Sequence, residues 1–136
     1  MSDYIIDHII KLKSRQELFD LIDKKLQFGA GAVRGISIHE QAGGKAVNVA
    51  YCLAKLGLNV TLFCMADKMG LDMLKQKFSS FEDGISLHTK NGEQGYNTAF
   101  EFLDEVSKVN LSDIKDNNKF GPETLSSKDD VKVLLQ

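Results

Sequence analysis

The sequence lacks any long hydrophobic run. No stretch of apolar residues approaches the roughly 18 residues of a membrane-spanning helix. The N-terminus, Met1-Ser2-Asp3-Tyr4, has no basic region ahead of an apolar segment, which argues against a secretory signal peptide. We therefore expect a cytoplasmic protein that does not contact a membrane.

Cysteine is scarce, with only Cys52 and Cys64 in the chain. Both lie in apolar, periodic segments, and free cysteine packs like a small hydrophobic residue. We expect two buried thiols. The alternative, a disulfide or redox pair, conflicts with the reducing conditions of the cytoplasm.

Clustered basic residues and closely spaced metal ligands are also missing. The 17 Lys and Arg residues and the 19 Asp and Glu residues give a net charge of -2 and are mixed along the chain. Nucleic-acid binding would need a clustered basic face. His8, His39 and His88 have no carboxylate or thiol at ligand spacing. We expect neither a nucleic-acid partner nor a metal site.

The chain does have enough length and apolar content for one domain. It has 136 residues, of which 43% are hydrophobic and 26% are charged. These values are typical of globular proteins with a buried core. There is no internal repeat and no low-complexity segment, so we expect residues 1–136 to form one domain.

The first part of the chain predicts a strand followed by a helix. Residues 5–12 are rich in β-branched side chains, which favour a strand. Ser14 and Glu17 have the spacing of a capping box, in which each side chain satisfies a backbone amide at the helix start. Apolar residues at helical spacing then predict a helix over about residues 15–25.

The middle of the chain carries stronger signals. Residues 28–42 contain three glycines and predict an interrupted, exposed strand or ribbon. Residues 46–56 predict a helix that ends at Gly57. Residues 59–65 are almost continuously apolar, as in a strand buried on both faces of a parallel sheet. Asp67 follows at the C-terminal end of that strand.

The rest of the chain alternates in the same way. The elements expected there are a helix over residues 71–81, a strand over 85–89, a hairpin of strands 96–103 and 106–111, a polar loop over 115–122 and a helix that begins at Ser127.

This alternation predicts an α/β fold with a parallel sheet and flanking helices. The glycine-rich ribbon and the hairpin do not fit such a core. We expect these segments, at about residues 28–42 and 95–111, to form a small accessory β-sheet inserted in the α/β core.

Residues 43–48, Gly-Gly-Lys-Ala-Val-Asn, open the helix predicted over residues 46–56. Two glycines let the backbone approach a ligand closely, and the first amides of a helix are unpaired and carry partial positive charge. Lys45 adds a full charge, and Asn48 offers a donor and an acceptor one turn along. The segment is either a site for a polar ligand or an ordinary helix entry with glycines in a tight turn.

The same segment does not match the common phosphate-binding loop. His39 stands where the first glycine of a P-loop would be, and Ala46 replaces the Ser or Thr that would bind magnesium.

Asp7 lies inside an otherwise apolar strand. A buried carboxylate without a partner is costly. We expect Asp7 either to pair with another group or to point into a ligand cleft.

Residues 43–50, followed by Leu-Ala-Lys-Leu-Gly at 53–57 and a buried strand, resemble the N-terminal signature of the ribokinase or PfkB family of carbohydrate kinases. The Asp-Lys-Met-Gly stretch at 67–70 resembles the family's Asp-x-x-Gly step. The Ile-Asp-His-Ile stretch at 6–9 resembles its first strand, whose aspartate faces the sugar. The spacing of all three segments agrees, and the resemblance covers most of residues 5–111.

The resemblance implies a partial ribokinase-like fold with a small β-sheet lid, and ATP-dependent phosphorylation of a sugar hydroxyl. By match, Asp7, Gly43, Gly44 and Asn48 would hydrogen-bond sugar hydroxyls, and Lys45 would stand at the edge of that cleft. The implied partners are a sugar or nucleoside, with ATP and Mg²⁺ in the full-length enzyme.

Two features depart from the family. The chain is about half the usual length, and it contains no Asp-Thr-x-Gly-Ala-Gly-Asp stretch, which supplies the catalytic base and the anion hole. Phosphoryl transfer depends on positioning and charge stabilisation. We therefore expect no catalytic residue in this chain, which would be the sugar-binding half of a kinase and inactive alone.

Two alternatives remain open. The chain could be a non-catalytic sugar- or nucleoside-binding module, or a structural domain that forms a homodimer through its exposed lid strands. The sequence does not specify which sugar or nucleoside is bound.

Overall fold

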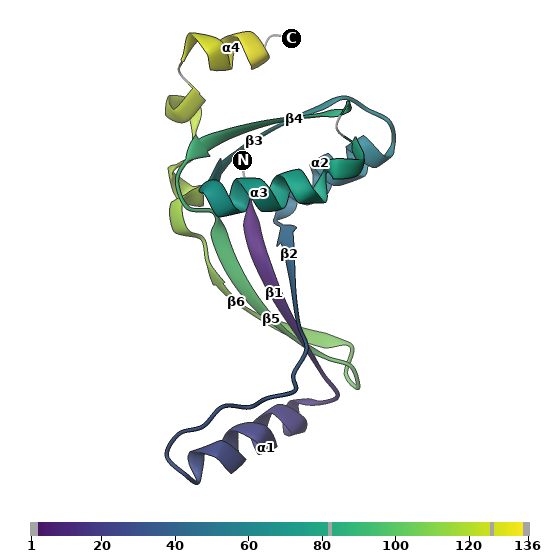
Figure 1. The fold of residues 1–136 in the computed structure, drawn as a ribbon, viewed down its shortest axis with the longest axis vertical. Helices are drawn as coiled ribbons and strands as arrows, with labels where there is room; N and C mark the ends of the chain where they lie inside the picture. The colour runs from purple at the N-terminus through teal and green to yellow at the C-terminus, as the bar shows by residue number, and fades with distance from the viewer. Residues whose placement is uncertain (1–2, 82, 126, 135–136) are drawn as a thin grey trace. The chain divides into compact units, whose positions relative to one another are not determined.

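Strands and helices alternate from Ile5 to Asn91 as the sequence predicts, and two further strands and a short C-terminal helix follow (Figure 1). The structure is a computed structural model that describes residues 3–81, 83–125 and 127–134. Its strands and α-helices are β1 (Ile5–Leu12), α1 (Arg15–Leu26), β2 (Ile38–Gly43), α2 (Lys45–Lys55), β3 (Val60–Ala66), α3 (Lys68–Lys77), β4 (Ile85–Asn91), β5 (Gly95–Phe102), β6 (Ser107–Asp113) and α4 (Lys128–Leu134).

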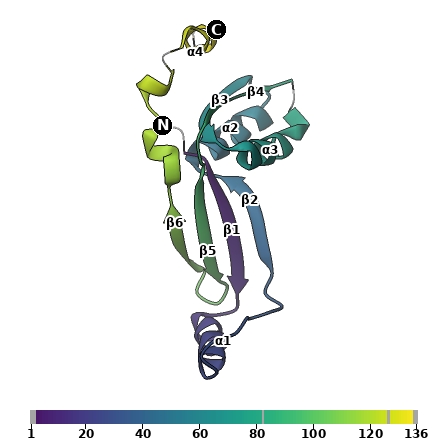
Figure 2. The ribbon, with the colours of Figure 1, turned by 60° about the vertical axis from the view of Figure 1, so that its left-hand side comes forward.

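The strands form two sheets. In the four-stranded sheet the neighbours are β2, β1, β5 and β6, in that order, and in the other sheet β3 pairs with β4 (Figure 2). Strands β3 and β4 run parallel, from Val60 opposite Ile85 to Ala66 opposite Asn91. A parallel pair needs a crossover connection, and α3 supplies it. The prediction of an α/β fold with a parallel sheet and flanking helices is confirmed.

The chain divides into two compact units. The first, called here the α/β unit, comprises Met1–Ile6, Gln41–Tyr96 and Asp113–Gln136. The second, called the sheet unit, comprises Asp7–Glu40 and Asn97–Ser112. Helices α2, α3 and α4 belong to the α/β unit, and α1 belongs to the sheet unit.

The core of the α/β unit lies between one face of β3 and the helices α2 and α3. Every second residue of β3 points to the same side, and these residues cluster with buried side chains of both helices. The members from these three elements are Leu62, Cys64 and Ala66 of β3, Val47 and Ala50 of α2, and Leu74 of α3, with Phe78 directly after α3.

Tyr4 fastens the start of β1 into the α/β unit. Its hydroxyl donates to the Gly70 carbonyl at 2.7 Å, and its ring is fully buried. Its backbone carbonyl accepts from the Gly95 amide at 2.9 Å and from Nδ2 of Asn117 at 2.9 Å. The first residue before β1 is therefore held by three segments that come much later in the chain.

The predicted glycine stop of α2 is confirmed. The Leu58 amide donates to the Leu53 carbonyl, and the Gly57 amide donates to the Ala54 carbonyl. Gly57 has φ +80°, a left-handed conformation that glycine adopts without steric cost. This pattern of two bonds is a Schellman motif, which satisfies carbonyls at the end of the helix.

The predicted capping box of α1 is present, with one difference. The Ser14 hydroxyl accepts from the Glu17 amide at 3.0 Å, while the Glu17 carboxylate accepts from the amide of Lys13, at 2.6 Å, instead of that of Ser14. No residue of α1 is buried, and Phe19 and Ile22 are exposed. The helix is therefore stabilised chiefly by local interactions.

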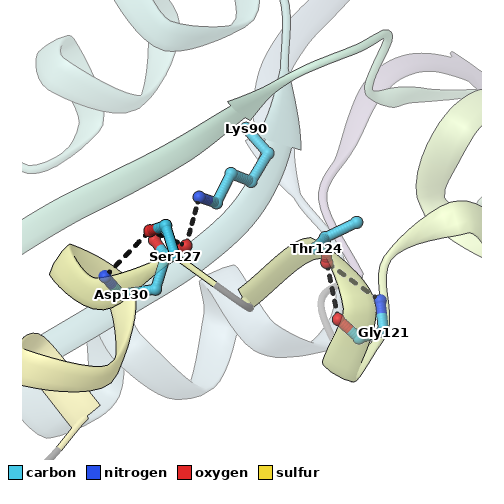
Figure 3. Close-up of polar contacts among 5 residues, drawn as sticks. All are labelled: Lys90, Gly121, Thr124, Ser127 and Asp130. Carbon is cyan, nitrogen blue, oxygen red and sulfur yellow. Dashed lines mark hydrogen bonds and ion pairs between the residues drawn. The ribbon is translucent and has the colours of Figure 1, made fainter.

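Ser127 caps the start of α4, at the position where the sequence predicts the helix to begin. The Ser127 hydroxyl accepts from the Asp130 amide at 3.1 Å. Oδ2 of Asp130 also accepts from Nζ of Lys90, on β4, at 2.6 Å (Figure 3). The hydrogen bond from Lys90, and next that with Ser127, lowers the pKa of Asp130 below its ordinary value. This ion pair attaches α4 to the end of β4.

Two segments differ from the sequence-based expectation. In the ribbon predicted over residues 28–42, the strand begins only at Ile38. Gly29 and Gly35 have φ +76° and +82°, whereas a strand requires negative φ values. The polar loop predicted over residues 115–122 contains two short 3₁₀ helices, Lys115–Lys119 and Pro122–Leu125.

The prediction of two buried thiols is wrong for one of them. Cys64 is buried, and Cys52 is exposed. On α2 the buried residues are Val47, Ala50 and Ala54, which share one face at helical spacing. Cys52 lies two residues after Ala50 and faces the opposite side.

Candidate functional site

The junction between β2 and α2 depends on glycine at position 44. Gly44 is the N-cap of α2, with φ 91° and ψ 157°, a conformation that is essentially restricted to glycine. A Cβ atom at this position would lie 2.0 Å from the carbonyl oxygen of Asp3. The backbone of residue 3 therefore passes so close that no other residue fits.

Two amides in the first turn of α2 already have partners within the chain. The Lys45 amide donates to Oδ2 of Asp3 at 3.4 Å, and the Asn48 amide donates to the Gly44 carbonyl at 3.0 Å. A carboxylate near a helix N-terminus is favourable because it meets the positive end of the helix dipole. The backbone conformation and the close contact with Asp3 explain why glycine is needed at position 44. Ligand binding at this junction stays a proposal.

The side chains around the junction differ in exposure. Gly43 is buried, whereas Lys45 and Asn48 are exposed. Within residues 3–81, 83–125 and 127–134, neither the ammonium group of Lys45 nor the amide of the Asn48 side chain has a hydrogen-bond or ion-pair partner. Both side chains are available to a ligand from solvent.

Asp7, the other predicted site residue, has found a partner. It is half-buried on β1, and its Oδ1 accepts from Nδ2 of Asn97, on β5, at 2.9 Å. Asp7 therefore pairs with a group of the chain, as one of the two possibilities requires, and its contact with a ligand stays a proposal. This contact lies within the sheet unit, whereas the glycine junction belongs to the α/β unit.

Asn97 is the centre of a small polar network. Its Nδ2 also donates to Oδ1 of Asn110 at 3.3 Å, and its Oδ1 accepts from Oγ of Ser112 at 2.7 Å. Strand β5 lies between β1 and β6, which brings the four side chains together. The sequence does not predict Asn97 as a site residue. Like Asp7, however, it is a polar residue within a predicted strand, which is a signal that could have indicated it.

The four-stranded sheet has a polar and an apolar face within the sheet unit. Side chains alternate between the faces along each strand, so the Asp7–Asn97 network occupies one face. The other face carries a hydrogen bond between Nε2 of His8 and Oε2 of Glu40, at 2.7 Å. The same alternation places Ile10, Ile38, Phe100, Val109 and Leu111 on that face, where Ile38 is 59%, Val109 53% and Leu111 62% exposed.

The Asp-Lys-Met-Gly segment forms the start of α3. The Asp67 carboxylate accepts from the Gly70 amide at 2.7 Å. The Asp67 amide donates to Oε1 of Gln94 at 3.1 Å, and Gln94 is fully buried. A Cβ atom at position 70 would overlap the Gln94 amide, so this glycine serves close packing.

Metal ligands and membrane-spanning helices are missing from the described part of the chain. Among those residues, no group of three or more His, Cys, Asp or Glu side chains is arranged to hold a metal ion. No helix in that part is both long and apolar enough to cross a membrane.

The fold is similar to those of solved sugar and nucleoside kinases. For adenosine kinase from Anopheles gambiae, the match covers 98% of this chain and 43% of the kinase, with a TM-score of 0.67 and 14% identity. For a carbohydrate kinase from Agrobacterium tumefaciens, it covers 98% and 40%, with a TM-score of 0.67 and 18% identity. For Arabidopsis thaliana ribokinase complexed with ribose and ATP, it covers 98% and 40%, with a TM-score of 0.61 and 14% identity.

No protein-family model matches the chain, and no curated protein is similar to it in sequence. The likeness at these identities concerns the fold alone. The chain has a partial ribokinase-like fold and spans about two fifths of the length of these relatives. At the level of fold, the resemblance to PfkB-type kinases that residues 43–50 suggest is confirmed.

Proposed function

We propose that this chain is the substrate-binding part of a cytoplasmic PfkB-type kinase, which phosphorylates a hydroxyl of a sugar or nucleoside with ATP. The observation that carries the proposal is the Gly-Gly-Lys-Ala-Val-Asn segment at the entry of α2 in a chain with the fold of sugar and nucleoside kinases. A fold alone does not define a function, so the segment is needed as well.

We assign substrate binding to Asp7, Gly43, Gly44, Lys45 and Asn48. A sugar hydroxyl both donates and accepts. The Asn48 side chain offers both roles from an exposed position, and Asp7 offers an acceptor. Lys45 would stand at the edge of the site, and the strands within about residues 28–42 and 95–111 would form a lid.

No catalytic residue is assigned in this chain. ATP and Mg²⁺ would be held by residues of the full-length enzyme that lie outside these 136 residues. This chain alone is then expected to bind a sugar or nucleoside without transferring a phosphoryl group.

The test is calorimetric titration of the chain with D-ribose and with adenosine. Asn48→Ala is expected to weaken binding about tenfold, since a hydrogen bond is lost on the ligand. Asn59→Ala, which truncates an exposed asparagine elsewhere in the α/β unit, is the control. An Asn48→Ala variant with unchanged affinity would refute the role of Asn48, and no binding of either probe by the wild type would refute the binding function.

The alternative of a non-catalytic binding module makes a different prediction. It predicts binding without ATP consumption even for the full-length gene product. An ATP-consumption assay of that product against sugars and nucleosides separates the two proposals.

A homodimer through the lid strands is a second candidate function, favoured by the apolar face of the four-stranded sheet. Exposed apolar patches of this kind often mark interfaces. Sedimentation velocity is expected to show a dimer that the double substitution Val109→Lys and Leu111→Lys converts to a monomer. Lys108→Glu, on the polar face of the same strand, is the control, and a wild type that stays monomeric at high concentration would remove this candidate.

A further inference from the structure

Asn97 is a buried polar residue to which the proposed function gives no role. Its side chain lies on β5 and the residue is only 9% exposed. We propose that Asn97 is a positioning residue for ligand binding: it holds the carboxylate of Asp7 so that Oδ2 accepts a hydroxyl group of a neutral polyol. The proposal rests on the assignment of Asp7 to substrate binding.

The orientation of the Asn97 amide is determined by its partners. A carboxylate only accepts hydrogen bonds, so the group 2.9 Å from Oδ1 of Asp7 must be the NH₂ end of the amide. Its second hydrogen meets Oδ1 of Asn110, and the carbonyl end accepts from Ser112. Both ends of the amide are fixed, and a single orientation follows.

The fixed amide leaves one oxygen of Asp7 for a ligand. Oδ1 is engaged by Asn97, and Oδ2 has no hydrogen-bond partner among the residues that the structure describes. Asp7 is half-buried, so a ligand can reach it. Because an ionised carboxylate has no hydrogen to donate, the matching ligand group is a donor such as a hydroxyl.

The charge around Asp7 narrows the ligand class further. Within the described part of the chain, no Lys, Arg or His side chain forms an ion pair with Asp7. Among the described residues, the one donor to Asp7 is the neutral amide of Asn97. A negatively charged ligand group next to this carboxylate would lose affinity because like charges repel. Next to Asp7, a hydroxyl of a neutral sugar or of the ribose of a nucleoside is therefore favoured over the carboxylate of a sugar acid or the phosphate of a sugar phosphate.

The experiment is a double-mutant cycle on the 136-residue chain, with binding of D-ribose and of adenosine measured by calorimetry at pH 7.5. Asn97→Ala is expected to weaken both affinities about tenfold in the wild-type background, which is typical of a lost hydrogen bond to a charged group. In the Asp7→Ala background it is expected to have no further effect, because a positioning residue acts only through its partner. Thr98→Ala, on the opposite face of β5, is the control.

A merely structural role makes the opposite prediction for the cycle. If Asn97→Ala weakens binding equally in both backgrounds, the positioning role is overturned. Asn97→Ser, which retains a hydroxyl for the network but is too short to reach Asp7, is measured in parallel. It is expected to reproduce the loss even if the alanine variant does not fold, and full affinity of the serine variant would also overturn the proposal.

The outcomes also separate this inference from the proposed function. If Asp7→Ala weakens binding and Asn97→Ala does not, the inference fails and the proposed function stands. If Asp7→Ala leaves the affinities unchanged, the assignment of Asp7 itself is wrong. D-gluconate is the probe for charge, and tighter binding of D-gluconate than of D-ribose would overturn the preference for a neutral ligand.

Discussion

Among single residues, Gly44 places the strictest steric limit on the sequence. It combines φ 91° with a close approach to the backbone of Asp3. Gly44→Ala is expected to lower the free energy of unfolding by roughly 2 kcal/mol or more, because backbone strain and a steric overlap add. Urea denaturation measures this loss.

The matched control for this substitution is Gly84→Ala. At position 84 a Cβ atom would meet its nearest neighbour, the Phe81 carbonyl oxygen, at 3.6 Å, which is ordinary van der Waals contact. We expect this variant to stay within about 0.5 kcal/mol of the wild type. Equal midpoints for the two variants would contradict the steric interpretation of Gly44.

The two thiols are expected to differ in reactivity. Burial raises the pKa of Cys64 to about 12, so at pH 8 almost none of this group is the reactive thiolate. Cys52 is exposed. Iodoacetamide at pH 8 is therefore expected to add one label to the folded chain, at Cys52, and two labels in denaturant; mass spectrometry of the peptides distinguishes these outcomes. Labelling of Cys64 at an equal rate in the folded chain would contradict the structure.

The residue-level features that the sequence did not reveal depend on contacts between distant segments. Asp7 is recognisable as a charge in an apolar strand, but its partner Asn97 is 90 residues away. The sequence indicates that Gly44 is a flexible residue at the start of a helix. Glycine is required there because the backbone of Asp3 packs against it. Cys52 lies in an apolar run, and its exposure depends on which side of α2 faces β3.

Among the elements, α1 is expected to be the helix most dependent on its own sequence. It buries no side chain, so the hydrogen bond of its N-cap, Ser14, contributes a large part of its stability. Ser14→Ala is expected to cost about 1 kcal/mol of local helix stability. Hydrogen exchange should become faster in α1, with the urea midpoint of the α/β unit unchanged, and Ser79→Ala is a control outside α1. Unchanged exchange in α1 would show that the capping bond contributes nothing.

The attachment of α4 is expected to depend on pH. The hydrogen bond from Lys90 lowers the pKa of Asp130 below its ordinary value of 3.8, so the folded chain favours the carboxylate form. The stabilisation is therefore complete above pH 3.8 and is lost as the pH falls through the lowered value. Below about pH 4, the amide signals of α4 in NMR spectra are expected to move toward random-coil positions before those of β3.

Two variants check the origin of this pH dependence. Asp130→Asn removes the titrating group, so the signals of α4 are expected to become insensitive to pH in this range. Asp129→Asn changes an exposed carboxylate of the same helix and is expected to leave the transition in place. If the transition persists in Asp130→Asn, another titrating group causes it.

The elements that the sequence predicts well are those with local signals. The helix ends at Ser14 and Gly57 follow from side-chain and backbone hydrogen bonds within a few residues. Strand β3 follows from its apolar run. The sequence predicts the strand to begin about ten residues earlier than β2 does, since composition does not reveal the positive φ values in the glycine-rich segment before Ile38.

For the molecule as a whole, the alternation of elements predicts the α/β class, and the resemblance of three short segments to PfkB-type kinases implies the kinase-like fold. The pairing of β1 with β5 is not readable in this way, because the two strands are separated by most of the α/β unit in sequence. The contacts around Asp7, which we propose to bind the ligand, depend on such pairings. The sequence therefore indicates Asp7 and residues 43–48 as candidate site residues. It does not indicate the network around Asn97.

The anchoring of Tyr4 has a consequence for the order of events during protein synthesis. Its carbonyl is held by Asn117, which is 113 residues later. At ribosomal rates of about 5–20 residues per second, on the order of 10 s pass before that partner is made. Until then the residue before β1 lacks its hydrogen bond from Asn117. A nascent chain stalled at Leu111 should therefore be cleaved by protease near Tyr4 more readily than a chain extended by a linker beyond Gln136. Equal cleavage of the two chains would show that the start of β1 is protected without the hydrogen bond from Asn117.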